Sequence, residues 1–177
     1  MTKKLKLTLI ISLIVIIFLY FFTALYSFHQ FHKGIYYNDK KLIKDYVEWD
    51  ELRENFKNYI NIQLIKETQK RDELKDLGEL GVLITGLAGK LVETMVDTYL
   101  NPEGLSLLIE KSEKKDEIPE PTFLTLIGGF TIMDFNGHSS FYITYKNEGQ
   151  EFPIFFNRKG FTWKITQIEL PQNLLSD

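Results

Sequence analysis

The stretch that decides the architecture of this chain is Leu7–Phe28, which reads LTLIISLIVIIFLYFFTALYSF and closely follows Lys3, Lys4 and Lys6. It contains no charged residue, and only Ser, Thr and two Tyr side chains interrupt its apolar character. A helix of about 20 apolar residues is long enough to cross the hydrocarbon core of a bilayer. The sequence therefore predicts that Leu7–Phe28 is a transmembrane helix in contact with the lipid bilayer.

A cleavable signal peptide begins in the same way, so the two interpretations have to be compared. Signal peptides carry a shorter apolar run, of roughly 7–15 residues, which ends at a cleavage site between small residues. Here Leu25, Tyr26 and Phe28 place bulky side chains where the peptidase needs small ones. We therefore expect residues 1–28 to be an uncleaved signal anchor and residues 29–177 to be an exported domain.

The distribution of lysines predicts the orientation of the anchor. Three lysines precede the span and favour a cytoplasmic N-terminus, although Lys33, Lys40, Lys41 and Lys44 behind it weaken this preference. In a Gram-negative cell this orientation gives a single-pass protein of the bacterial inner membrane, with the bulk of the chain in the periplasm.

Charge and composition narrow the function classes. All 24 acidic residues follow the span, whereas three of the 21 Lys and Arg precede it, so the exported part has six more negative than positive charges. Nucleic-acid binding rests on basic surface, and we therefore expect no nucleic-acid partner. The sequence contains no cysteine, which excludes disulfides, thiol catalysis and thiolate metal ligands.

Hydrophobic periodicity and turn residues predict an α+β domain. Residues 29–111 form its helical half. The expected helical segments are residues 29–37 as a continuation of the first helix, Lys40–Tyr46 behind an Asn38 or Asp39 cap, Asp50 to about Lys70, Glu79–Leu100 and Pro102–Glu110. A charged linker, residues 112–122 with Pro119 and Pro121, separates this half from a β half at 123–171.

The β half reads as an antiparallel meander of about four strands. Asn136-Gly137 is a strong hairpin signal. The expected strands cover Phe130–Phe135, Ser140–Lys146, Glu151–Asn157 and Phe161–Ile168. Alternation gathers large side chains on one face, namely Phe141, Ile143, Tyr145, Phe152, Ile154, Phe156 and Trp163. The preceding helices are expected to cover this face, either as a packed core or as one wall of a ligand pocket.

The helix expected over Glu79–Leu100 carries an apolar stripe and several glycines. Leu80, Leu83 or Ile84, Leu87, Leu91 and Met95 recur at helical spacing, which predicts that they form its buried face. Glycines in a helix favour the close approach of another backbone. The alternative is that the small residues form a surface for pairing with a partner or with lipid.

Four segments of the chain carry a family resemblance. They are DYVEWDELR at 45–53, Leu91-Val92 with Asp97, NPEGL at 101–105, and Trp163-Lys164 with Leu170-Pro171. Over roughly residues 34–171 the pattern resembles the bacterial family called domain of unknown function 2939. The resemblance implies a membrane segment followed by an exported domain, and it implies no activity and no catalytic residues. The order of elements is also similar to the nuclear transport factor 2-like or cystatin-like cone.

Catalytic and metal-binding motifs are absent from the sequence, which contains no G-x-S-x-G, H-E-x-x-H, P-loop or G-x-G-x-x-G pattern. His29 and His32 could share a metal but have no evident third ligand, and His138 falls in a predicted turn. Glu93 and Asp97 lie on one helix face, where a solvated or ion-paired role is favoured over acid–base catalysis. We therefore expect no enzymatic activity, no metal and no cofactor.

Six residues are predicted to have structural roles. Arg53 is expected to pair with Asp97 across a helix interface. Asn101 is expected to cap a helix that begins at Pro102, with Glu103 at its positive end. Trp163 is placed on the apolar face of the sheet.

Two functions from different classes remain after these exclusions. The first is a scaffold or assembly component that docks onto another protein of the cell envelope. The second is a module that binds a small molecule or lipid between the sheet and the helices.

Overall fold

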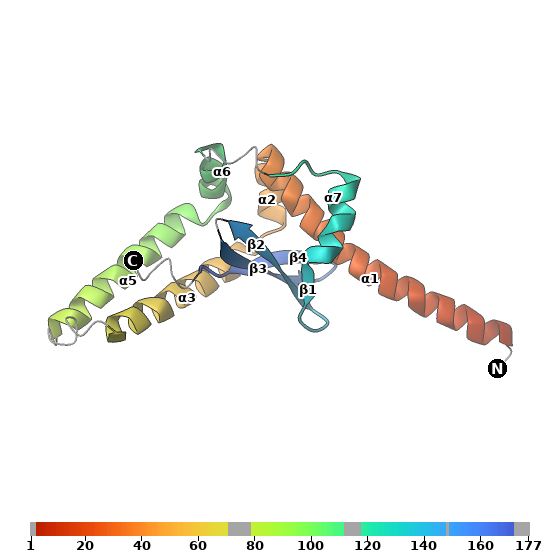
Figure 1. Cartoon of the computed structure of the whole chain (residues 1–177), viewed down its shortest axis with the longest axis horizontal. Helices are drawn as coiled ribbons and strands as arrows, with labels where there is room; N and C mark the ends of the chain where they lie inside the picture. The colour runs from red at the N-terminus through yellow and green to blue at the C-terminus, as the bar shows by residue number, and fades with distance from the viewer. Residues whose placement is uncertain (1–2, 71–78, 112–117, 148, 172–177) are drawn as a thin grey trace.

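The computed structural model describes residues 3–70, 79–111, 118–147 and 149–171. The molecule is elongated: a long helix extends to one side, a pair of helices extends to the other, and a four-stranded sheet lies between them (Figure 1). Helices and one antiparallel sheet confirm the predicted α+β class with an N-terminal helix.

Helix α1 (Lys3–Tyr37) is continuous and has two different environments along its length. From Leu7 to Leu19 every large apolar side chain is between 48% and 66% exposed, and we call this segment the exposed stretch. Further along, Ala24, Leu25 and Phe28 are buried in the domain core. The helix therefore runs on beyond the predicted span, and its second half packs into the core.

Within the described residues, five shorter α-helices follow α1. They are α2 (Lys40–Asp45), α3 (Trp49–Lys70), α5 (Glu79–Tyr99), α6 (Pro102–Lys111) and α7 (Phe123–Gly128). The side chain of Asp39 caps α2 by accepting hydrogen bonds from the backbone N–H groups of Lys41 and Leu42. Figure 1 shows α3 and α5 running side by side, away from the sheet. Most of the predicted linker lies outside the described residues.

The sheet has the order β1-β2-β3-β4, and each neighbouring pair is antiparallel, which confirms the predicted meander. Its strands are β1 (Met133–Phe135), β2 (Ser140–Asn147), β3 (Gln150–Lys159) and β4 (Thr162–Ile168). The first strand is shorter than expected, because the 3-10 helix η2 (Gly129–Ile132) occupies the residues before Met133. Gly137 has a φ of +85°, as the predicted hairpin turn between β1 and β2 requires.

The apolar face of the sheet is closed by α1 and forms the core. Phe141, Phe156 and Trp163 are fully buried, and the rings of Phe141 and Phe156 stack at 4.6 Å. Phe28 of α1 meets Phe156 edge-on at 6.2 Å. Within the described residues α1, and not the glycine-bearing helix α5, packs on this face.

Candidate functional site

Two hydrogen bonds and an aromatic contact join α1 to the sheet. Ser27 Oγ accepts a hydrogen bond from the backbone N–H of Trp163 at 3.0 Å, and Thr23 Oγ1 accepts one from its indole Nε1 at 3.1 Å. The ring of Tyr20 meets the Trp163 ring edge-on at 5.5 Å. Trp163 therefore fixes both the depth and the rotation of α1 against β4.

Thr23 and Ser27 were not recognised from the sequence as contacts of the domain. Tyr20, Thr23 and Ser27 are spaced so that they share one helix face. This spacing within an apolar helix is a signal that could have identified the side of α1 that packs on the sheet.

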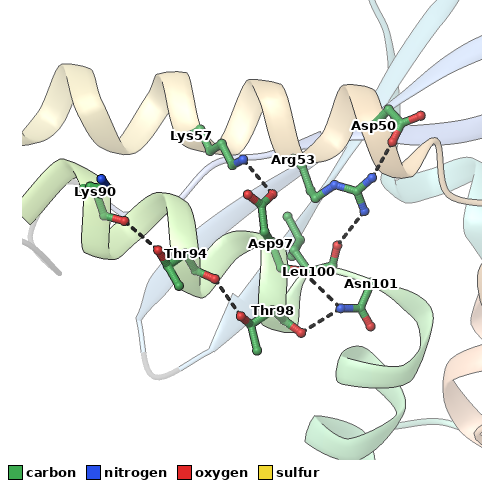
Figure 2. Close-up of polar contacts among 9 residues, drawn as sticks. All are labelled: Asp50, Arg53, Lys57, Lys90, Thr94, Asp97, Thr98, Leu100 and Asn101. Carbon is green, nitrogen blue, oxygen red and sulfur yellow. Dashed lines mark hydrogen bonds and ion pairs between the residues drawn. The ribbon is translucent and has the colours of Figure 1, made fainter.

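Polar contacts also join α3 to the C-terminal end of α5 (Figure 2). Lys57 Nζ of α3 lies 2.6 Å from Asp97 Oδ1 of α5, and Arg53 Nη1 donates to the carbonyl oxygen of Leu100 at 3.3 Å. Arg53 also forms an ion pair with Asp50, one turn earlier in its own helix. The predicted pair of Arg53 with Asp97 is therefore wrong: Lys57 takes the carboxylate, and Arg53 satisfies a carbonyl at the end of α5.

A tight corner connects α5 to α6. Asn101 Oδ1 accepts a hydrogen bond from the backbone N–H of Gly104 at 2.8 Å, while its Nδ2 donates to the carbonyl of Thr98 at 2.7 Å. Pro102 is the first residue of α6, and Glu103 lies in its first turn. These contacts hold α6 at a fixed angle beyond the end of α5.

The apolar stripe of α5 faces outward, in contradiction to the prediction that it is buried. Its described members are between 59% and 66% exposed; they are Leu80, Leu83, Leu87, Leu91 and Met95. We call this set the α5 apolar face. Helix α3 packs on another side of α5, where Val96 is buried and a methyl group added to Gly89 would lie 3.4 Å from Asn61 Oδ1. The stripe therefore points away from the side of α5 that contacts α3.

Comparison with known proteins places the chain in a family. One family model matches residues 13–108, more than half of the chain, and the family is described as Protein of unknown function (DUF2939). The chain belongs to this family. The match begins inside the exposed stretch of α1 and ends in α6, so it includes the α5 apolar face and excludes the sheet. No curated protein and no solved structure matches the chain, and the cone analogy stays a prediction.

The histidines and acidic residues of this DUF2939 protein do not gather into a cluster within the described ranges, where no group of three or more potential metal ligands occurs. Burial lowers the pKa of His32, a hydrogen bond with the Pro119 backbone raises it less, and nearby His29 lowers it. His138 is exposed in the β1–β2 turn, and Glu93 is exposed on α5.

A small apolar cavity lies between α1 and the β1–β2 hairpin of the DUF2939 protein. Its volume is about 340 Å³. Ile16, Ile17, Tyr20, Phe21, Phe135, Gly137 and His138 line it. It adjoins the end of the exposed stretch of α1, because Ile16 and Ile17 belong to both.

Proposed function

We propose that this protein is a single-pass, membrane-tethered docking component without catalytic activity, whose domain binds another protein of the cell envelope. One observation carries the tether. Helix α1 exposes apolar side chains from Leu7 to Leu19 and then continues without a break into the domain core. By length and composition, α1 can cross a membrane.

The contacts of α1 support an anchor rather than a cleaved signal. Cleavage near Ala24 would remove the contacts of Tyr20 and Thr23 with Trp163 and leave the core residues Leu25 and Phe28 at a new chain end. A signal peptide, by contrast, is dispensable for the fold of the mature domain. Lysines before the span support a cytoplasmic N-terminus and a periplasmic domain on the inner membrane.

The α5 apolar face supports the docking role. Contiguous apolar surface on a folded domain commonly marks an interaction site, because its burial releases ordered water. The face lies on α5, which Lys57 and Arg53 of α3 hold in place through polar contacts, so its orientation in the domain is fixed. Tethering to a membrane raises the effective concentration of such a face for partners in the same membrane.

The ion pair of Asp97 supports a structural rather than catalytic role for the predicted carboxylate pair. Asp97 Oδ1 is bonded to Lys57 Nζ at 2.6 Å and joins two helices. An acid–base pair would instead need one carboxyl in a desolvated setting that raises its pKa, whereas Glu93 is exposed.

Site-specific photo-crosslinking in intact cells tests the docking role. A photoreactive phenylalanine analogue is placed at Leu87 or Leu91 on the α5 apolar face, and at exposed Glu93, on another side of the same helix, as the matched control. We expect the same protein adduct from the first two positions, absent from the control. Its loss in the Leu87→Asp, Leu91→Asp double variant would tie the adduct to the face. Adducts with lipid alone, or equal adducts from all three positions, would contradict the proposal.

A further inference from the structure

Two turns of the sheet meet at the point where α1 enters the domain. The β1–β2 and β3–β4 turns lie at the same end of the meander, and the backbone N–H of Arg158 donates to the carbonyl of Ser139 at 2.8 Å. The guanidinium of Arg158 sits 5.0 Å from the centre of the Tyr20 ring, and the Phe135 ring lies 5.0 Å from that of Phe21. We call this end of the sheet the juxtamembrane edge.

The side chains of the juxtamembrane edge suit a bilayer interface. Phe161, in the β3–β4 turn, is 87% exposed, more than any other large apolar side chain among the described residues. Arg158 brings a positive charge to the same turn and donates through Nε to the carbonyl of Gly160 at 2.9 Å. An exposed aromatic ring beside a basic side chain is typical of the headgroup region of a membrane, where the ring reaches the acyl boundary and the cation meets phosphate.

The length of the exposed stretch gives a second, independent reason. Leu7–Leu19 spans about 20 Å at 1.5 Å per residue, whereas the hydrocarbon core of a bilayer is about 30 Å thick. On the domain side, Tyr20 and Phe21 are already in contact with the sheet. Beyond Leu19, Phe22 and Tyr26 on the other side of α1 are still 42% and 45% exposed, so the remaining depth of the span lies beside the edge of the sheet.

The cavity beside this part of α1 has an apolar lining. Ile16 and Ile17 of the exposed stretch line it, together with the rings of Phe21 and Phe135. Its volume, about 340 Å³, is in the range of small-ligand sites. An apolar chain entering from the bilayer would bury its surface here, while a water-soluble ligand would find little to bind through hydrogen bonds.

We propose that the juxtamembrane edge binds a bilayer phospholipid, with one acyl chain in the cavity and the phosphate beside Arg158. This inference rests on the proposed tether, because the cavity reaches the bilayer only if α1 spans it. Phe161 then lies at the acyl boundary, and the domain is held against the membrane surface at one fixed depth. The β2–β3 turn, at the opposite end of the sheet, stays in water.

Spin-label accessibility on the full chain tests the depth, and the absence of native cysteine makes each site unique. His138→Cys and Phe161→Cys probe the edge, Tyr145→Cys is the control towards the far end of the sheet, and Ile14→Cys reports on the tether. Each labelled protein is reconstituted in phosphatidylcholine–phosphatidylglycerol nanodiscs, and collision rates with oxygen and with a soluble nickel chelate are compared. We expect a several-fold higher oxygen-to-nickel ratio at the two edge sites than at Tyr145.

The four labels separate the possible failures. If the edge labels match the Tyr145 label while the Ile14 label favours oxygen, the tether stands and the phospholipid proposal is overturned. If the Ile14 label also favours nickel, the tether itself fails and the proposal falls with it.

A phospholipid carrying a diazirine on its acyl chain tests occupancy of the cavity. We expect adducts in residues 133–139, at the juxtamembrane edge, and none in residues 145–152, at the opposite end of the sheet. Arg158→Gln should reduce the adducts several-fold, whereas Lys40→Gln, which removes an equal charge at an exposed position of α2, should not. Adducts confined to α1, or equal losses in both variants, would overturn the assignment of chain and phosphate.

Discussion

Replacing Ser27 with alanine tests whether the second half of α1 belongs to the domain core. Ser27 Oγ is the acceptor for the backbone N–H of Trp163 at 3.0 Å, and both residues are buried, at 1% and 0% exposure. The substitution leaves that N–H without its partner in a site that water does not reach. Leaving a buried donor unsatisfied costs about 1–3 kcal/mol of unfolding free energy. For a domain of this size each kcal/mol lowers Tm by roughly 2–4 °C, so we expect a loss of about 2–12 °C.

The assay is thermal unfolding of the full-length protein in nanodiscs, followed by near-ultraviolet circular dichroism. Thr8→Ala is the matched control, because the exposed Thr8 hydroxyl donates only to the carbonyl of Lys4, one turn earlier in α1, at 3.1 Å. We expect the control to melt with the wild type. If Ser27→Ala also melts with the wild type, the hydrogen bond does not anchor α1 to β4, and the reasoning is refuted.

Three further predictions follow from local contacts. Gly104→Ala should lower Tm severely, since the new methyl would lie 2.3 Å from a backbone oxygen. Gly86→Ala on α5 is the matched control: its methyl meets no described atom within 4 Å, and the variant should gain about 0.5–1 kcal/mol of unfolding free energy. Lys57→Met should cost no more than about 1 kcal/mol, because its ion pair with Asp97 is partly solvated; denaturant unfolding will measure it, and a larger loss would mean a more desolvated pair. Burial lowers the pKa of His32 in the folded protein, so the unfolded chain takes up a proton first as the pH falls below about 6.5. The Tm should therefore fall with pH in this range until the folded pKa is passed. A His32→Gln variant whose Tm depends on pH as steeply as that of the wild type would contradict this.

The sheet was predictable because its signals are local. Alternating Phe141 and Ile143 and the Asn136-Gly137 turn set strand, face and connection within a few residues. The cap of α6 at Asn101 was predictable for the same reason, since one side chain satisfies backbone donors of the turn that follows it.

The features that could not be predicted depend on tertiary packing, that is, on which face of one element packs against which face of another. A stripe such as Leu87 and Leu91 indicates that one face of a helix is apolar, but it does not show whether the neighbouring helix packs on that face or, as α3 does here, on another side. Likewise, lipid and a protein core both accept the apolar residues of α1, so hydropathy alone does not distinguish Leu13 from Leu25. Arg53 donates to the carbonyl of Leu100 and does not pair with Asp97, because Lys57, one turn further along α3, reaches that carboxylate.

The intact mass of the protein recovered from native membranes tests the central claim most directly, that α1 is both membrane anchor and core helix. We predict that the chain stays in the membrane fraction after alkaline carbonate extraction and retains its first 28 residues, with the mass of the full 20.8 kDa chain apart from processing at Met1. A soluble chain shortened by cleavage within α1 would contradict the account, because that product would lack the side chains that close the core.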